Sequence, residues 1–227
     1  CHEEIVSAVS WSTLWSRPKD HHLCQGCTAK LPFITGETCN KCSRPFSTLD
    51  PHFREGNTCT DCIRWNQDPE WAEILEENHS IFSYDDFLKE TIARYKFRGD
   101  YIMAKAFAPF IREELKNLKF DCLVPIPLSP ERLYERGFNQ SAVLIQEAGY
   151  KAAEMLKRIH SEKQSKKSRL ERIHHNQVFE LLNFNIENKV ILLIDDIYTT
   201  GSTLYHAAKV LKTGGAASVS SLTLARG

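Results

Sequence analysis

The chain has 227 residues, of which 42% are hydrophobic, and its 29 basic side chains balance its 29 acidic ones. That hydrophobic fraction is enough to build a core, which excludes an intrinsically disordered chain. A membrane-spanning helix needs about 20 consecutive apolar residues, whereas the apolar runs of this chain end after about five, as in residues 190–194. We therefore expect a globular protein without membrane insertion.

The balanced charge conceals two different parts of the chain. Residues 1–78 carry 7 basic and 12 acidic side chains, and residues 79–227 carry 22 basic and 17 acidic ones. The net charges are therefore −5 and +5, and such an asymmetry favours two units with different surroundings. We expect one domain with its connector at residues 1–78 and a second domain at residues 79–227.

Cysteine pairs dominate the first unit, which holds seven of the eight cysteines. No secretory signal is recognisable, so we expect a cytoplasmic protein, in which paired cysteines are metal ligands more often than disulfides. Three Cys-x-x-Cys pairs follow one another: Cys24/Cys27, Cys39/Cys42 and Cys59/Cys62. The two later pairs, with 16 residues between them, have the spacing of a zinc ribbon. Four thiolates leave no open position for a water, so this zinc is expected to be structural.

The first pair, Cys24 and Cys27, needs two further ligands. The chain begins at Cys1 rather than at a methionine, so we expect preceding residues to be absent, and a cysteine among them would complete a second zinc site with Cys1. Two alternatives stay open for the pairs. A thioredoxin-like redox pair would require a βαβ setting, which residues 20–65 lack, and a disulfide scaffold would require an oxidising compartment.

From residue 81 onward, helical periodicity alternates with short apolar strands. Asp85 or Asp86 is placed to cap a helix whose apolar face carries Leu88, Ile92 and Tyr95.

Beyond Gly99, which ends that helix, residues 102–115 predict a second one with a kink at Pro109. Leu123 and Val124 predict a strand that stops at the next proline pair. This alternation predicts an α/β fold with a mainly parallel sheet.

The most informative segment begins at residue 190. Five consecutive apolar residues, 190–194, predict a strand buried on both faces. Asp195 and Asp196 follow at its carboxyl end, where open α/β sheets bind ligands. A turn of small residues, 199–203, leads into a helix whose apolar face begins at Leu204.

This arrangement predicts a phosphorylated ribose as the ligand. Backbone N–H groups and hydroxyls at a helix N-terminus form an anion site for a phosphate, and Gly201 lets the backbone approach closely. The two carboxylates would repel a second anion, so we expect them to face sugar hydroxyls, together with Mg²⁺. The alternative is that these polar residues serve only as helix caps.

Residues 194–203 resemble the phosphoribosyl-pyrophosphate (PRPP) signature of type I phosphoribosyltransferases. Together with the cysteine pairs, residues 95–99 (Tyr-Lys-Phe-Arg-Gly) and 136–140 (Arg-Gly-Phe-Asn-Gln) resemble the ComF family, late-competence proteins of naturally transformable bacteria. The likeness covers nearly the whole chain. It implies a type I phosphoribosyltransferase-like α/β domain with a mainly parallel sheet, preceded by a small N-terminal zinc-ribbon domain.

The resemblance also assigns roles to residues. Asp195 and Asp196 would hold the ribose hydroxyls. The 5′-phosphate would lie on the turn, formed by Thr199, Thr200, Gly201, Ser202 and Thr203. The pyrophosphate, with Mg²⁺, is expected near residues 127–129.

Residues 157–175 are strongly basic, with seven Lys or Arg, three His and two acidic residues, and they predict a mobile loop. In transferases of this superfamily such a loop closes over the reacting centre and supplies charge to the leaving pyrophosphate. The candidates for that role are Lys163, Lys166, Lys167 and Arg169. The same charges could instead contact nucleic-acid phosphates, or the segment is a solvated polar loop. The nucleic-acid candidates are Lys96, Arg98, Arg132, Arg136, Lys166, Lys167 and Arg169.

Three functions stay open at this point. The resemblance implies a cytoplasmic component of DNA uptake that binds PRPP and single-stranded DNA beside a helicase-like, ComFA-like translocase. Phe97, Phe138 and Tyr198 are candidates for base stacking. The alternative is an active phosphoribosyltransferase on a nucleobase or related amine, although no acceptor pocket is recognisable and residues 219–224 are expected to form a strand. A regulator that binds the ligand without reacting it is the third.

Overall fold

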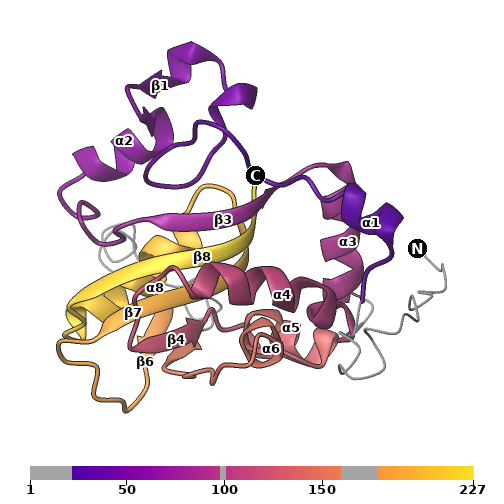
Figure 1. The fold of residues 1–227 in the computed structure, drawn as a ribbon. Helices are drawn as coiled ribbons and strands as arrows, with labels where there is room; N and C mark the ends of the chain where they lie inside the picture. The colour runs from indigo at the N-terminus through magenta and orange to yellow at the C-terminus, as the bar shows by residue number, and fades with distance from the viewer. Residues whose placement is uncertain (1–21, 98–100, 160–177) are drawn as a thin grey trace.

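A parallel β-sheet forms the centre of the molecule. The computed structural model describes residues 22–97, 101–159 and 178–227 (Figure 1). Four strands pair in the order β3-β8-β7-β4, and every neighbouring pair is parallel. The strands are β3 (Asn78–Ser83), β4 (Cys122–Pro125), β7 (Val190–Tyr198) and β8 (Ser218–Arg226). The predicted α/β fold with a mainly parallel sheet is confirmed.

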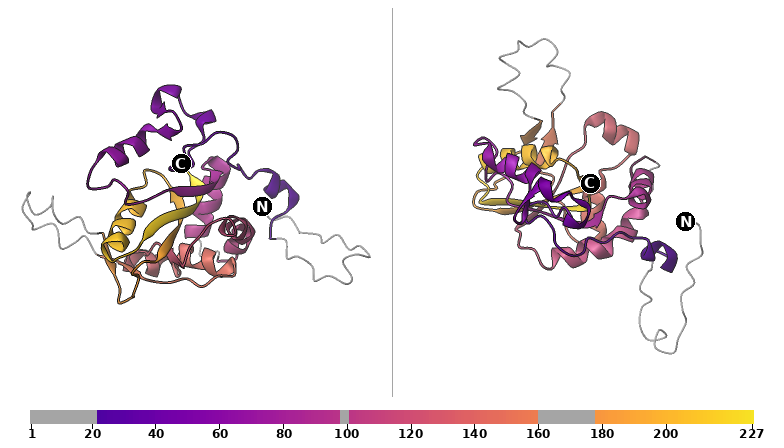
Figure 2. Two further views of the ribbon diagram at one scale, coloured as in Figure 1. Left: turned by 60° about the vertical axis from the view of Figure 1, so that its left-hand side comes forward. Right: turned by 90° about the horizontal axis from the view of Figure 1, so that it is seen from above.

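Helices cover both faces of this sheet, because the apolar side chains of β7 alternate between two cores. Leu192 and Ile194 belong to the core under α3 (Asp86–Phe97), α4 (Met103–Leu115) and α6 (Gln140–Glu147). Ile191 and Leu193 belong to the core under α8 (Ser202–Thr213). The left view of Figure 2 shows α8 on one side of the sheet and α3 and α4 on the other.

The two predicted helices of this domain are present. In α3 the side chains of Leu88, Ile92 and Tyr95 are fully buried, and the Asp85 carboxylate accepts a hydrogen bond of 2.8 Å from the Leu88 N–H, which is the capping interaction expected from the sequence. Helix α4 runs from Met103 to Leu115 with Pro109 inside it.

Strand β7 is longer than the sequence predicts. The expected strand ended at Ile194, whereas the observed one continues to Tyr198, so Asp195 and Asp196 lie inside it. The reason is β8, which pairs with β7 residue by residue as far as the match of Tyr198 with Arg226. The carboxylates are therefore fixed by a sheet ladder rather than carried on a loop.

The part of the cysteine-rich unit that carries the four later cysteines packs against the same face of the sheet as α8, whereas Leu31 packs in the core of the other face. The unit contains the short helices and strands α1 (Gln25–Ala29), η1 (Phe46–Thr48), η2 (Pro51–Phe53), β1 (Arg54–Glu55), β2 (Thr58–Cys59) and α2 (Thr60–Gln67). Its four later cysteines share one buried cluster with Val219 of β8 and Leu204 of α8. Strand β3 begins at Asn78, the last residue of the first unit as expected from the sequence.

The remaining elements lie around the carboxyl end of β4. They are α5 (Pro130–Arg136) and the antiparallel pair β5 (Leu156–Arg158) and β6 (Phe179–Leu181). Within the described ranges, none of the helices has the length and apolar character that crossing a membrane requires.

Candidate functional site

Two carboxylates lie near the carboxyl end of β7. Asp195 Oδ1 accepts hydrogen bonds from the Ser141 hydroxyl, at 3.3 Å, and from the Asp196 N–H, at 2.9 Å. Burial raises the pKa of Asp195 to about 6, although the positive charge of Lys96 opposes the change. A buried carboxylate with two donors and a raised pKa is typical of a functional site.

Basic side chains surround this pair. The Lys96 ammonium, from α3, forms an ion pair with Asp196, and burial lowers the pKa of Lys96 to about 8. Burial, together with repulsion from Arg132, lowers the pKa of Arg136 and also that of Arg158. These four basic groups outnumber the nearby carboxylates of Asp195, Asp196 and Glu135, which act on them. The site therefore has an excess of positive charge and suits an anionic ligand.

The turn after β7 presents its backbone in one orientation. The carbonyls of Tyr198 and Thr199 accept hydrogen bonds of 3.2 and 2.9 Å from Arg226, and the Thr200 carbonyl accepts one of 2.9 Å from the Trp65 indole. In a planar trans peptide the next N–H points the opposite way, and the described residues contain no cis peptide. The N–H groups of Thr199, Thr200 and Gly201 therefore all point away from these donors.

Nothing in the described ranges accepts a hydrogen bond from these three N–H groups. They precede Ser202, the first residue of α8, so the helix dipole adds positive potential at the same place. Backbone N–H groups gathered at a helix N-terminus bind phosphate. The turn therefore offers the donors that a phosphate requires, beside a carboxylate pair, and phosphate binding there stays a prediction.

Gly201 is required by the geometry of this turn. Its φ of +84° lies in the left-handed region, and a Cβ there would lie 2.3 Å from the Tyr198 hydroxyl. Because only glycine adopts this φ without a steric cost and no side chain fits, the position admits no other residue without distortion.

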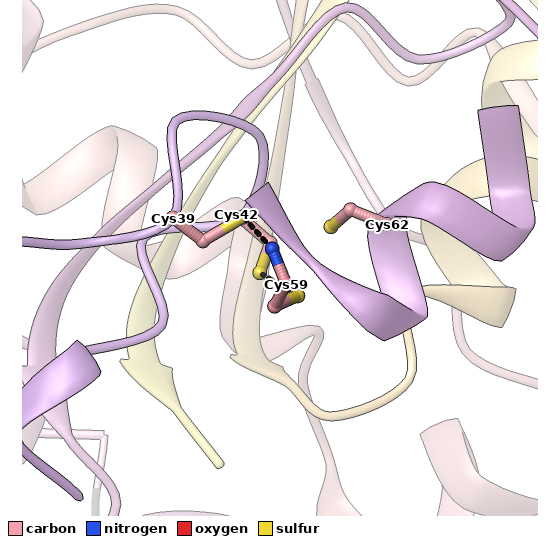
Figure 3. A group of neighbouring side chains, drawn as sticks. All are labelled: Cys39, Cys42, Cys59 and Cys62. Atoms are coloured by element: carbon pink, nitrogen blue, oxygen red, sulfur yellow. Dashed lines mark hydrogen bonds between the residues drawn. The ribbon is translucent and has the colours of Figure 1, made fainter. Parts of the chain in front are cut away.

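The four later cysteines form a compact cluster, with all four sulfur atoms within 4.8 Å of one another. Figure 3 shows the side chains turned towards one another, with Cys62 projecting from α2. A tetrahedral zinc with bonds of about 2.3 Å places its sulfur ligands about 3.8 Å apart, and the Cys42 and Cys59 sulfurs are separated by 3.7 Å. In addition, the Cys59 N–H donates a hydrogen bond of 3.3 Å to the Cys39 sulfur. The predicted set of Cys39, Cys42, Cys59 and Cys62 fits a structural zinc.

Of the second predicted metal site, the structure describes Cys24 and Cys27. Cys24 is the N-cap of α1, and its sulfur accepts a hydrogen bond of 3.4 Å from the Cys27 N–H, as in a metal-binding knuckle. Cys1 lies outside the described residues. A second zinc site with Cys24, Cys27 and Cys1 stays a prediction.

The predicted nucleic-acid residues lie in different environments. Lys96 is a site residue whose side chain is only 18% exposed, so it is not part of an outer basic surface. Arg132 is exposed on α5, and Arg136 donates a hydrogen bond of 2.9 Å to Gln140. Arg98, Lys163, Lys166, Lys167 and Arg169 lie outside the described residues.

Of the three aromatic candidates for base stacking, Tyr198 is buried, Phe138 is half-buried against Tyr95 and Tyr101, and the side chain of Phe97 lies outside the described part of the structure. Neither Tyr198 nor Phe138 is available as an open platform. The structure presents a different aromatic ring, because Tyr134 on α5 is 92% exposed.

Sequence reasoning missed three residues of the site, which are Ser141, Arg158 and Arg226. Ser141 directly follows the Arg-Gly-Phe-Asn-Gln motif, and Arg158 opens the basic segment, so both were close to a noted pattern. Arg226 is 3% exposed at the end of an apolar strand. A charged residue that continues a buried strand was the available signal.

Comparison with known proteins agrees with both parts of the structure. The family "Double zinc ribbon domain" matches residues 14–63, and the family "Phosphoribosyl transferase domain" matches residues 104–227. Competence protein ComFC of Bacillus subtilis is 40% identical over 100% of this chain and 93% of its own length. Competence protein ComFC of Streptococcus pneumoniae is 34% identical, over 100% and 98%. DNA utilization protein YhgH of Escherichia coli is 25% identical, over 90% and 96%. The chain therefore belongs to the ComFC family of competence proteins.

Proposed function

We propose that this protein binds PRPP at the carboxyl end of β7 and acts as a cytoplasmic component of DNA uptake in natural transformation. The observation that carries the ligand is the juxtaposition of Asp195 and Asp196 with the outward-pointing N–H groups of the 199–201 turn. Carboxylates bind a sugar diol and N–H donors bind a phosphate, and PRPP contains both groups on one ribose.

In this proposal each part of the site has one role. Asp195 and Asp196 accept hydrogen bonds from the ribose 2′- and 3′-hydroxyls. Residues 199–203 hold the 5′-phosphate, with the hydroxyls of Ser202 and Thr203 beside the backbone donors. The pyrophosphate lies near residues 127–129, where its charge meets the excess of basic groups. Mg²⁺ would accompany the pyrophosphate and offset its negative charge, since Mg²⁺ prefers carboxylate and phosphate ligands.

The role in DNA uptake follows from the relatives. The relatives from Bacillus subtilis and Streptococcus pneumoniae are named competence proteins, and the relative from Escherichia coli is named a DNA utilization protein. Single-stranded DNA would lie along α5, which carries the exposed side chains of Tyr134 and Arg132. Base stacking on an aromatic ring beside basic residues is a common way to hold single strands. A helicase-like, ComFA-like translocase is the proposed protein partner.

The PRPP site is tested by calorimetric titration of the zinc-loaded protein with PRPP and Mg²⁺. We expect Asp195→Asn and Asp196→Asn each to lose at least about tenfold in affinity, because a hydrogen bond to a charged group contributes about 1.5–3 kcal/mol. Asp86→Asn, an exposed carboxylate on α3, is the control and should bind as the wild type does. If all three variants bind PRPP with equal affinity, the proposed site is wrong.

The DNA surface has its own test, with a fluorescent oligothymidine and anisotropy as the readout. Tyr134→Ala should lower the affinity by about 5- to 150-fold, the equivalent of one stacked base at about 1–3 kcal/mol. Tyr134→Phe keeps the ring and should retain the wild-type affinity. If Tyr134→Ala binds the oligonucleotide equally well, the DNA does not use α5.

An active phosphoribosyltransferase is the second candidate, and a cavity favours it. A space of about 380 Å³ opens between Pro127, Leu133, Phe138 and Leu156, beside the proposed pyrophosphate position. Apolar and aromatic walls of this kind suit a planar base. Release of pyrophosphate from PRPP with any nucleobase of a panel supports an enzyme, and no release with the whole panel at saturating PRPP supports ligand binding without reaction.

A further inference from the structure

Arg226 lies between the cysteine cluster and the phosphate turn. It is the last residue of β8 and is only 3% exposed. Its Nε and Nη2 atoms each lie 3.4 Å from the Cys42 sulfur. On the other side, Nη1 donates hydrogen bonds to the carbonyls of Thr199, at 2.9 Å, and Tyr198, at 3.2 Å. One planar guanidinium therefore contacts a predicted zinc ligand and the turn at the same time.

A buried guanidinium requires a compensating charge. In the part of the chain that the structure describes, no Asp or Glu side chain forms an ion pair with Arg226, although Nη1 also donates to the Gly227 carbonyl. Besides these carbonyls, the guanidinium contacts the Cys42 sulfur, and a zinc bound by four thiolates is a negatively charged cluster. The face of the Tyr198 ring, 4.7 Å from the guanidinium carbon, adds a cation–π contact. The zinc-loaded cluster would thus supply the negative charge that the three carbonyl partners of Arg226 do not carry.

A second contact joins the same two regions. Trp65 follows Cys62 by one helical turn in α2 and donates its indole N–H to the Thr200 carbonyl. Its ring is stacked on Tyr205 of α8, with centroids 4.0 Å apart and planes inclined by 9°. The carbonyls of three consecutive residues, Tyr198 to Thr200, are therefore held by groups that the cysteine cluster positions.

We infer that Arg226 is a positioning residue that couples the zinc cluster to the phosphate turn. With its carbonyls held by Arg226 and Trp65, the turn keeps the three N–H groups aimed at the place of the ligand phosphate. Loss of the metal releases the Cys42 sulfur and with it the guanidinium, so the turn loses its fixed orientation. Because coupling between two sites is reciprocal in binding free energy, ligand at the turn also strengthens the binding of zinc.

The inference rests on the proposed PRPP site for its ligand arm but not for its structural arm. In the ligand arm, competition with a chelating dye measures the zinc affinity of the holo-protein with and without PRPP. Saturating PRPP should raise the zinc affinity at least about fivefold in the wild type, the lower end of typical allosteric coupling. Arg226→Met should remove this dependence and should weaken PRPP binding at least about tenfold.

Three further variants separate positioning from loss of fold. Arg226→Lys keeps the charge but cannot contact the sulfur and both carbonyls at once, so we expect it to behave like Arg226→Met. Trp65→Phe keeps the stack on Tyr205 and removes one donor, which should weaken PRPP binding by a smaller factor. Arg54→Met is the matched control, because Arg54 lies over Phe46 and pairs with Glu37 without touching the turn. Full rescue by Arg226→Lys would overturn the inference.

The structural arm uses hydrogen exchange of the peptide that contains residues 198–203, measured without ligand. Exchange should increase by the same factor in Arg226→Met and in wild-type protein from which zinc is being released, and it should not change in Arg54→Met. If the wild type fails to bind PRPP but this pattern holds, the ligand proposal is wrong and the coupling stands. If exchange in Arg226→Met equals that of the zinc-loaded wild type, the coupling is wrong whatever the ligand is.

Discussion

Replacing the buried carboxylate of Asp195 should make the folded protein more stable while it removes ligand binding. The pKa of Asp195 rises from its ordinary value of 3.8 to about 6, mainly because the side chain is buried. At pH 7 the folded protein must therefore hold a charge that its environment disfavours. That difference in pKa corresponds to about 3 kcal/mol of unfolding free energy.

The sign follows from proton linkage. A carboxyl group whose pKa is higher in the folded state makes its stabilising contribution below pH 4, and the contribution is lost as the pH rises through 6. Asn is neutral at every pH, and its Oδ1 can still accept from Ser141 and from the Asp196 N–H. We expect Asp195→Asn to raise the unfolding free energy by up to about 3 kcal/mol at pH 7 and by about half of that at pH 5.

Urea unfolding of the zinc-loaded proteins at both pH values measures these differences, and comparing each variant with the wild type at one pH cancels changes in zinc affinity. The melting temperature should rise by about 6–12 °C at pH 7. Asp86→Asn, on the surface of α3, should change stability by less than about 1 kcal/mol. An Asp195→Asn protein that is equally or less stable than the wild type at pH 7 would refute the reasoning about burial.

Three further predictions concern single side chains. Gly201→Ala should cost about 2 kcal/mol or more and weaken PRPP binding in a titration, because the new Cβ meets the Tyr198 hydroxyl at 2.3 Å; unchanged stability would mean that the turn adapts. Cys59→Ser should lower the zinc content measured by mass spectrometry and cost several kcal/mol in stability, whereas Cys122→Ser, outside the cluster, should retain the metal. Ser141→Ala should raise the pKa of Asp195 still further, since it removes a hydrogen bond of 3.3 Å to the charged form; carbon-detected NMR of the carboxyl group measures it, and a lower pKa would contradict the assignment.

Local signals in the sequence were enough to find the parts of the site. Two residues separate Cys39 from Cys42, and two separate Cys59 from Cys62. This spacing predicts a zinc cluster, because a metal-binding knuckle is a local structure. The apolar run 190–194 followed by carboxylates and a small-residue turn predicts a strand, a site and a helix start in order. All these features depend on residues that are close together along the chain.

The contacts that complete the site join distant parts of the chain, and no local pattern encodes them. Arg226 and Cys42 are 184 residues apart, and Trp65 and Thr200 are 135 apart. The sequence groups Lys96 with the basic nucleic-acid candidates, whereas α3 places it beside Asp196. The extension of β7 through two carboxylates was missed for the same reason, since it depends on pairing with β8.

The position of β8 between β3 and β7 has a consequence for folding during synthesis. Strand β3 pairs with β8 alone among the described strands, and their partners Asn78 and Ser221 are 143 residues apart. At about 5–20 residues per second, the ribosome needs about 7–30 s to make the residues between them. During that time β3, which carries Ile81 and Phe82, has no partner in its own sheet and is exposed to association with other chains. All four cysteines of the cluster lie within residues 39–62. Metal binding is therefore a folding step that can be complete before the ribosome has made β8.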